Sequence, residues 1–432
     1  MSRHSVIDGL RDRFLSMADG FTLLFVVALA ATTLMRFWLG WRHMSHIRAH
    51  RSAVPAAFSS TIALEAHQKA ADYTIARLRV AFLEIGVGAL FLVILTLGGL
   101  LQGLFDVWQR VFEPASYWHG IAFIAGVVVL GFCVELPFSL YRIFVVEQRF
   151  GFNKMTWKLF VADLAKEALV SVVIGLPVLL AVLWLMAHMG TLWWLHVWLF
   201  WLGFNLLVLL IYPTYIAPLF NQFTPLGDEA LKGRIERLLA RCGFRPSGLF
   251  VMDGSRRSAH GNAYFTGFGA AKRVVFFDTL LEKLQPNEIE AVLAHELGHY
   301  KLRHIWKRIT LVSLGSLAFL WLLGYLIDQS WFYEGLGMTS RSSAAALTLF
   351  SLVVPVFAFP LAPLASMLSR RHEFEADAYA AEQTRAGDLI AALVKLYRDN
   401  AATLTPDPLY STFYDSHPPA AVRIARLQGA PT

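Results

Sequence analysis

PNEIEAVLAHELGH, residues Pro286–His299, is the segment from which the rest of the chain can be interpreted. It predicts an α-helix, because a proline suits the first helical turn, acidic residues there suit the helix dipole, and apolar residues recur at helical spacing. Positions i and i+4 of a helix share one face, so the imidazoles of His295 and His299 can both reach one Zn²⁺. The segment therefore predicts a metal-binding helix. The plainer alternative is an amphipathic surface helix that carries two histidines.

Glu296 lies between these histidines and projects about 100° away from His295 around the helix. From there its carboxylate can face a metal-bound water and accept a proton from it. This HExxH pattern is typical of zinc peptidases, so it predicts peptide-bond hydrolysis with Glu296 as general base. Cys133 and Cys242 are far apart and form no CxxC pair, so neither a cysteine metal site nor a thiol protease is indicated.

The chain around this motif is strongly apolar. Of its 432 residues, 56% are hydrophobic and 16% are charged, whereas soluble domains contain about 25% charged residues. A membrane-spanning helix needs about 20 mostly apolar residues. The stretches that meet this requirement are 21–41, 80–104, 117–138, 168–188, 192–214, 308–327 and 345–367. We therefore expect an all-α multi-pass membrane protein with about seven transmembrane helices.

Lys and Arg are concentrated in two of the loops between these stretches. These are the loop between the first and second stretches and the loop between the third and fourth. The positive-inside rule places both loops in the cytoplasm, together with the HELGH segment and the C-terminal tail. Topology thus explains the net charge of +7, and we expect membrane lipid, not nucleic acid, as a partner.

A catalytic zinc needs a third protein ligand as well as one open position. Beyond the last apolar stretch, RRHEFEAD (Arg370–Asp377) places Glu373 and Asp377 on one helix face. One carboxylate can bind zinc while the other accepts the N–H of a ligand histidine. His372 and Glu375 remain candidates as well, and a solvated charged helix is the plainer alternative.

The chain is expected to divide into four parts. Residues 1–215 form transmembrane helices 1–5 with basic cytoplasmic loops, and residues 308–367 form helices 6 and 7. Residues 216–307 form a cytoplasmic α+β zinc protease domain that carries HELGH, and residues 368–432 form a tail that completes the zinc site. Within the protease domain we expect a helix at Asp228–Cys242 and strands at Gly248–Met252, His260–Thr266 and Arg273–Phe277.

Taken together, these features resemble the type 1 CaaX prenyl endopeptidases, which are integral-membrane gluzincins that remove the last three residues of prenylated proteins. The resemblance covers nearly the whole chain. Besides HELGH, it rests on EQRFGFNK at 147–154, FNQFTPL at 220–226, HGNAYF at 260–265, RRHEFEAD at 370–377 and SHPP at 416–419. It implies a ring of seven helices around a water-filled intramembrane chamber. Glu84 and Glu135, inside predicted spans, indicate either such a hydrated interior or an arginine partner on another helix.

The resemblance also implies how the metal is held. It assigns His295, His299 and Glu373 as ligands of one zinc ion per chain. It makes Glu296 the general base and Asp377 the carboxylate that orients a ligand histidine.

Further residues are implied to contact substrate. His417 becomes a catalytic hydrogen-bond donor to the transition state, Arg423 a basic residue of the substrate site, and Asn262-Ala263-Tyr264 an edge strand that binds a peptide by strand addition. Each has a plainer alternative. Asn262 can be a turn residue, Tyr264 a core residue, His417 a loop or capping residue, and Arg423 the partner of an acid on the tail.

Three functions are compatible with these features. The first is a membrane zinc metalloendopeptidase that cuts near the C-terminus of prenylated CaaX-type substrates. The second is a quality-control protease for membrane proteins that needs no lipid on its substrate. The third is a non-catalytic zinc-binding membrane scaffold. The Ala-, Leu-, Arg- and Trp-rich composition favours a bacterial inner membrane, with the endoplasmic reticulum as the alternative and the active site on the cytoplasmic side.

Overall fold

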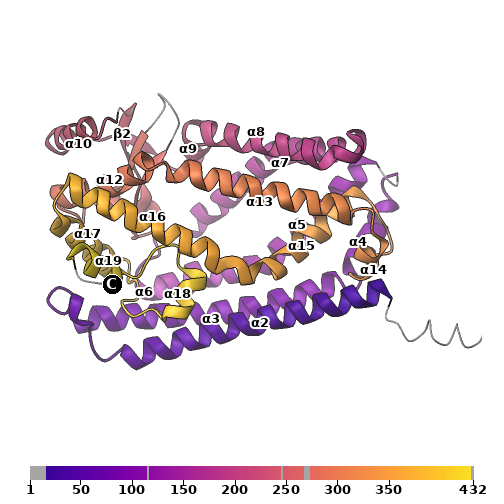
Figure 1. Cartoon of the computed structure of the whole chain (residues 1–432), viewed down its shortest axis with the longest axis horizontal. Coiled ribbons are helices and arrows are strands. Elements are labelled where there is room, and N and C mark those ends of the chain that lie inside the picture. Colours follow the sequence, from indigo (N-terminus) through magenta and orange to yellow (C-terminus); the bar gives the residue numbers. More distant parts are fainter. Residues whose placement is uncertain (1–15, 114–115, 245–246, 267–272, 430–432) are drawn as a thin grey trace, which may run out of the picture.

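The computed structural model describes residues 16–113, 116–244, 247–266 and 273–429. Within them, seven helical segments are long and apolar enough to cross a membrane, as the sequence predicted. They are Met17–His50, Leu64–Leu95, Tyr117–Phe150, Trp157–His188, Gly190–Phe220, His304–Leu326 and Ser343–Gln383. In Figure 1 these helices run along the length of the molecule, and the small sheet lies at one end.

The helices of the membrane part are α2 (Met17–His50), α3 (Leu64–Leu95), α4 (Leu100–Gln109), α5 (Tyr117–Tyr141), α6 (Gln148–Phe150), α7 (Trp157–His188), α8 (Trp193–Ile211), α9 (Ala217–Phe220), α13 (His304–Leu326), α14 (Ser330–Glu334), α15 (Ser343–Ala358) and α16 (Ala362–Gln383). The other elements are β1 (Phe223–Pro225), α10 (Glu229–Arg241), β2 (Gly248–Met252), β3 (Ala263–Thr266), β4 (Arg273–Phe277), α11 (Asp278–Leu281), α12 (Pro286–Lys301), α17 (Ala386–Asp399), α18 (Pro408–Tyr414) and α19 (Ala420–Leu427).

The second span differs from its predicted bounds of 80–104. Helix α3 starts well before this range, because its first turns carry polar and charged side chains that a hydropathy criterion passes over. It ends at Leu95, and α4 begins after Gly98 and Gly99. Gly99 has φ +74, a left-handed conformation that suits glycine, so the chain turns here instead of continuing as one helix.

At the end remote from the sheet, the membrane helices share an apolar core. It includes Phe25 of α2, Leu101 of α4, Phe123 of α5, Phe332 of α14 and Leu349 of α15, which are all fully buried. Burying a side chain of this size contributes about 1.5–3 kcal/mol. This core therefore stabilises the end of the bundle that contains neither group of possible metal ligands found among the described residues.

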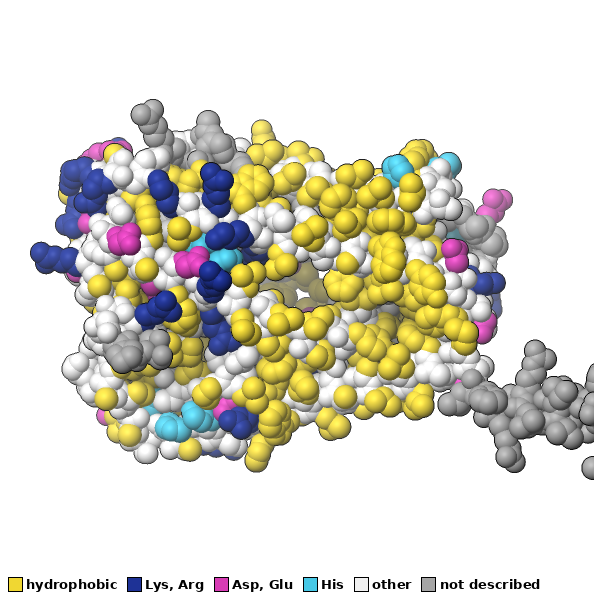
Figure 2. Space-filling view, in the orientation of Figure 1, with side chains coloured by type: hydrophobic (Ala, Val, Ile, Leu, Met, Phe, Trp, Pro, Cys, Tyr) yellow, Lys and Arg dark blue, Asp and Glu magenta, His cyan; other side chains and the backbone are white. Residues whose placement is uncertain are grey.

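The interior between the helices also contains polar groups and open space. Arg142 forms ion pairs with Glu84 of α3 (2.8 Å) and with Glu135 (2.5 Å). Glu84 therefore has an arginine partner on another helix, as one alternative predicted, whereas Glu135 and Arg142 lie on the same span. Glu135 also lines a cavity of about 400 Å³ together with Asp163 and Arg257. Figure 2 shows the apolar face of the molecule hollowed near its middle, among the membrane helices.

The region predicted to form the protease domain contains a four-stranded sheet of order β1-β2-β4-β3, which leaves β3 at an edge. Strands β2 and β4 have their predicted bounds, whereas β3 begins three residues late. The reason is that Gly261 donates its N–H to the side chain of Asn400 (3.1 Å) and the carbonyl of His260 accepts from Thr279, outside the sheet. Strand β1 was not predicted, because a three-residue segment shows no alternation.

The buried core of this domain contains side chains from residues 216–307 and from helices α16 and α17. Ile235 of α10, Phe276 of β4 and Leu293 of α12 pack in one buried cluster with Ala380 of α16 and Leu389 of α17. The tail helices are thus part of the same folded unit as HELGH. Figure 2 shows Lys and Arg side chains gathered at this end of the molecule, as the positive-inside rule led us to expect.

Candidate active site

Helix α12 carries the HELGH motif and starts where the sequence predicted. The backbone N–H of Gln285 donates to the Glu288 carboxylate (2.7 Å), and Pro286 occupies the first helical turn. Lys395 of α17 also donates to Glu288 (2.7 Å), so the start of the helix is tied to the tail. These contacts fix the helix that presents both histidines.

Three potential metal ligands converge at α12 and α16. The Nε2 atoms of His295 and His299 lie 3.3 Å apart, and they lie 3.4 and 3.2 Å from the two carboxylate oxygens of Glu373. A tetrahedral zinc with ligand bonds of 2.0–2.2 Å holds its ligand atoms about 3.4 Å apart. Glu373 Oε2 is buried without a hydrogen-bond partner among the described residues. Arg423 Nη1 lies 3.7 Å from this oxygen, beyond hydrogen-bond distance. A buried carboxylate oxygen without a hydrogen bond favours a directly bound cation, so the group fits a zinc ion.

Close packing of α12 against α16 makes this convergence possible. A Cβ atom at Gly298 would lie 2.9 Å from the Cα of Ala376 and 3.2 Å from its carbonyl oxygen. Real side chains avoid such contacts, so only glycine fits between the two helices here. Gly298 lies one residue before His299, and Ala376 lies about one turn after Glu373, so the contact sets the ligand distances.

Asp377 contacts Nδ1 of His295, the ring nitrogen that does not face Glu373. Nδ1 of His295 lies 2.9 Å from Asp377 Oδ1, and Arg423 donates two hydrogen bonds to the same carboxylate (2.8 and 2.5 Å). Burial alone would lower the pKa of His295, but Asp377 and Glu373 outweigh it and raise that pKa to about 9. Arg423 is only 5% exposed, so it lies behind the metal ligands, as in the plainer alternative of pairing with an acid of the tail.

Replacing Asp377 by Asn is expected to weaken zinc binding about 10- to 100-fold, because the amide removes the charge that orients His295. The dissociation constant for zinc, measured by competition with a chelator, checks this result. The matched control is Asp399→Asn on α17, an acid that pairs with Arg398 and touches no candidate ligand. Equal zinc affinity in both variants would contradict the role of Asp377.

Glu296 and His417 both lie close to the three candidate ligands. Burial raises the pKa of Glu296, while the charges of His295, His299 and His417 lower it. His417 Nε2 lies 3.5 Å from Glu373 Oε1, and its side chain is 61% exposed. His417 therefore lies where a substrate could reach it beside the candidate ligands.

The predicted substrate strand coincides with the free edge of the sheet. Asn262 is exposed and its side chain accepts the N–H of Ala263 (2.8 Å), so it closes the turn before β3. Its carbonyl accepts from Phe277 of β4. Tyr264 is partly buried on β3. The outer side of β3 has no neighbouring strand among the described residues, so its backbone is available for pairing.

His304 is a site residue that sequence reasoning missed. Its Nδ1 lies 3.0 Å from Nδ1 of His299, and its Nε2 lies 3.0 Å from Glu375. The ring of His372 stacks on that of His304, with 4.1 Å between ring centroids. His372 and Glu375 therefore lie with His304 and are not part of the group formed by His295, His299 and Glu373. The sequence feature that could have indicated this role is the position of His304, five residues after His299. Arg303, with φ 58, turns the chain so that His304 returns to the site.

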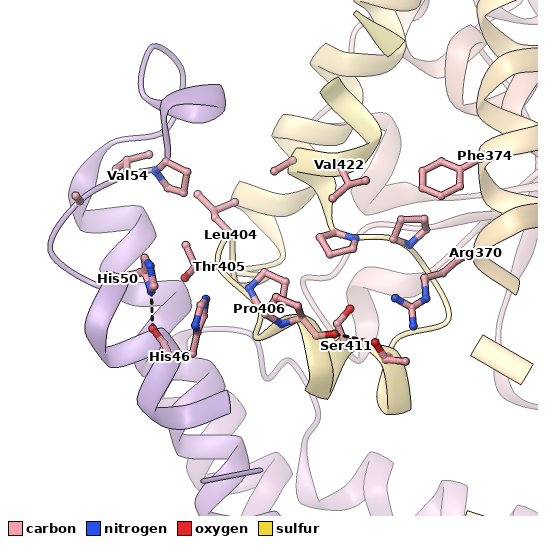
Figure 3. A pocket seen from close by; sticks show the side chains of 17 residues that line it. His46, His50, Val54, Arg370, Phe374, Leu404, Thr405, Pro406, Ser411 and Val422 are labelled. Carbon is pink, nitrogen blue, oxygen red and sulfur yellow. Dashed lines mark hydrogen bonds between the residues drawn. The ribbon is translucent and has the colours of Figure 1, made fainter. Parts of the chain in front are cut away.

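A pocket of about 780 Å³ lies beside this site, between the end of α2, the helix α16 and the tail. Figure 3 shows Arg370 and Phe374 of α16 on one side of it and His46 and His50 of α2 on the other. Pro418, next to His417 in the chain, forms part of the wall. Its volume is in the range of ligand pockets, so there is room for a peptide next to His417.

Comparisons with known proteins agree with this geometry. The family described as CAAX prenyl protease N-terminal, five membrane helices, matches residues 43–222, and peptidase family M48 matches residues 225–430. CAAX prenyl protease 1 homolog of Arabidopsis thaliana is 40% identical over 72% of this chain and 74% of its own length. The Caenorhabditis elegans homolog is 31% identical over 94% of this chain and 97% of its own. A crystal structure of S. mikatae Ste24p superposes with a TM-score of 0.87 at 30% identity, covering 94% of this chain and 99% of that one.

Proposed function

Because this chain belongs to the CAAX prenyl protease family of M48 peptidases, we propose that it is a membrane-embedded zinc endopeptidase that cuts CaaX-type substrates near their C-terminus. One observation carries the proposal: Glu373 Oε2, buried without a hydrogen-bond partner among the described residues, lies 3.4 Å from Nε2 of His295, while Oε1 of the same carboxylate lies 3.2 Å from Nε2 of His299. Glu296, on the same helix, supplies the base that hydrolysis requires.

His295, His299 and Glu373 would hold one zinc ion per chain. When bound, the zinc supplies Lewis-acid polarisation of the scissile carbonyl and acidifies the attacking water. Glu296 accepts the proton of that water and delivers it to the nitrogen of the leaving amine. Asp377 holds the ring of His295 in the tautomer whose Nε2 faces the metal, and we propose that Arg423 acts through Asp377 as a positioning residue.

His417 is proposed to donate a hydrogen bond to the oxyanion of the transition state. Ser416 Oγ lies 3.0 Å from His417 Nδ1, and a hydroxyl that donates to Nδ1 leaves the ring proton on Nε2. Nε2 lies 3.5 Å from Glu373 Oε1, beside the candidate ligands, so its N–H would be available to a carbonyl bound there.

Replacing His417 by Ala is expected to lower kcat about 10²- to 10³-fold, since one donor to the oxyanion is lost. Zinc content should stay unchanged, because His417 is not a ligand. Steady-state kinetics together with metal analysis checks both results, with His196→Ala, an exposed histidine of α8, as control. Unchanged turnover in the His417 variant would remove this residue from the mechanism.

Substrate is proposed to bind along β3 as an added strand. The backbone groups of Ala263 and Tyr264 would pair with the peptide, and Asn262 would contact it at the start of the strand. Main-chain pairing accepts varied side chains, which suits a protease whose substrates share only a short terminal motif. The pocket lined by Arg370 and Phe374 would accommodate part of the peptide.

Whether the substrate must be prenylated is tested with a farnesylated CaaX peptide and its unprenylated counterpart. We expect detergent-purified protein to cleave the farnesylated peptide far faster, because the lipid can enter the open space between the membrane helices, and we expect Glu296→Gln to cleave neither. Equal cleavage of both peptides would favour the quality-control protease. Zinc binding without any cleavage would favour the non-catalytic scaffold.

The same proposal includes the arrangement of the chain in a membrane. We propose that the chain has the four parts predicted from its sequence, which are residues 1–215, 216–307, 308–367 and 368–432. The protease domain and the tail lie on the cytoplasmic side, and lipid surrounds the spans. The basic end of the molecule supports that orientation. The bacterial inner membrane stays a prediction from composition, because the relatives named above are eukaryotic and lend it no support.

A further inference from the structure

The pocket between α2, α16 and the tail is lined by two side chains whose buried polar atoms have no partner. Nε and Nη2 of Arg370 and Oγ of Ser411 are buried, and none of them forms a hydrogen bond with a described residue. Both residues line the pocket of about 780 Å³, and Figure 3 shows the Arg370 side chain extending toward Ser411 of α18. A buried guanidinium costs free energy unless it is paired, so this part of the pocket favours an anion.

The two unpaired nitrogens of Arg370 lie on one edge of its guanidinium. Elsewhere in this chain the same edge holds a carboxylate. Nε and Nη2 of Arg257 donate to the two oxygens of Asp163 (2.8 and 3.0 Å), and those of Arg423 donate to the two oxygens of Asp377 (2.8 and 2.5 Å). Two parallel hydrogen bonds of this kind match a carboxylate in shape and charge. Arg370 is only half-buried, so a rotation of its side chain presents this edge to the pocket.

The acidic side chain near Arg370 leaves this edge unoccupied. Asp415 lies near both Arg370 and Ser411. Arg370 Nε and Nη2 nevertheless form no hydrogen bond with it, and Ser411 Oγ lies outside hydrogen-bond geometry. Asp415 does not line the pocket, and neither does any other acid among the described residues. An anion that enters the pocket therefore meets the guanidinium without a competing carboxylate beside it.

Arg370 also lies at a suitable distance from the candidate metal ligands. It precedes Glu373 by three residues on α16, which is about 4.5 Å along the helix axis. Long side chains of a helix lean toward its N-terminus, so the guanidinium lies on the order of 10 Å from the Glu373 carboxylate. Three residues of an extended peptide span about 10 Å. Pro418, next to His417, lines the same pocket, so one peptide can reach both places.

We propose that Arg370 binds the C-terminal carboxylate of the substrate, with Ser411 as a second donor, and thereby fixes the distance between the chain end and the bond that is cut. This inference rests on the proposed peptidase function and names the feature of the substrate that the pocket recognises. The residues that precede the carboxylate would pack against the apolar part of the pocket wall, which includes Val54, Phe374, Leu404 and Val422.

The experiment compares a farnesylated CaaX peptide that ends in a free carboxylate with the same peptide ending in an amide. Full-length protein in detergent should cleave the amide with a kcat/KM about 10- to 100-fold lower, because a buried charge loses its partner. Arg370→Gln should cleave the acid about as slowly as the wild type cleaves the amide, and should not distinguish the two peptides. Arg370→Lys keeps the charge but not the two-donor edge, so it should recover part of the preference.

Arg371→Gln is the matched control, because Arg371 is the next residue of α16 and its side chain is 78% exposed. This variant should keep the wild-type ratio of acid to amide cleavage. Zinc content, measured on every variant, should stay unchanged, because neither arginine is a candidate ligand. Equal cleavage of the two peptides by the wild type, or a wild-type ratio in Arg370→Gln, would overturn the proposal.

A binding measurement separates this inference from the proposed catalytic function. Fluorescent forms of the two peptides are titrated with Glu296→Gln protein, which gives Kd without turnover. We expect the acid to bind at least about tenfold more tightly, and the difference should vanish in Glu296→Gln/Arg370→Gln. Preferential binding of the acid with no peptidase activity in the parent enzyme would refute the function and retain the carboxylate site. Cleavage by the parent enzyme without any such preference would retain the function and refute the site.

Discussion

Glu296→Gln is expected to lose about four to six orders of magnitude in turnover while zinc remains bound, a range scaled from the removal of single catalytic groups in other proteases. Gln has nearly the same shape as Glu but cannot accept the proton of the attacking water. Glu296 is not one of the three candidate ligands, so its replacement leaves them in place. The measurements are kcat on a farnesylated CaaX peptide and the zinc content of the same preparation.

The matched control for this experiment is Glu290→Gln on the same helix. Glu290 forms an ion pair with Arg234 (3.0 Å) on the surface of the protease domain, away from the ligands. Its loss should leave turnover close to the wild-type value. An active Glu296→Gln enzyme, or an inactive Glu290→Gln enzyme with full zinc, would reject Glu296 as the general base.

Gly298→Ala is expected to reduce kcat/KM at least about 100-fold and to weaken zinc binding, although it adds a single methyl group. The new Cβ would meet the backbone of Ala376 at 2.9 Å, so α12 and α16 must separate. Overpacking of this kind costs about 1–3 kcal/mol. Separation also moves Glu373 away from His295 and His299, and a misplacement of about 1 Å can cost 10²-fold in rate.

Gly233→Ala on α10 is the control, because a Cβ there meets only the flexible end of Arg237 at 3.6 Å. Alanine is the better helix former, so this variant should be slightly more stable than the wild type. Thermal unfolding, zinc affinity and kcat/KM are measured on both variants. A Gly298→Ala enzyme with wild-type zinc affinity would show that the helices adjust without moving the ligands.

Much of the membrane architecture could be predicted because lipid imposes a simple requirement of length and apolarity on each span. That requirement says little about where polar helical turns continue a span into water. For this reason the start of α3 at Leu64 was missed, and the break at Gly98 and Gly99 was read as part of a single span.

The first two ligands could be predicted because i and i+4 share a face on any α-helix. The third could not be chosen from spacing alone, because Glu373 and its acidic and imidazole neighbours differ only in the face that meets α12. The Gly298 contact with Ala376 decides that face, and it depends on tertiary packing. His304 was missed for a similar reason, since the left-handed turn at Arg303 brings it back to His299.

The two ligand-bearing helices are extensions of two separate membrane segments. Only Leu302 and Arg303 separate α12 from α13, and Glu373 lies in the charged C-terminal part of the helical segment Ser343–Gln383. Helices adapt to hydrophobic mismatch by tilting, and tilt slides one helix along its neighbour. We therefore expect the acyl-chain length of the surrounding lipid to influence the distance between His299 and Glu373, and with it the rate of hydrolysis.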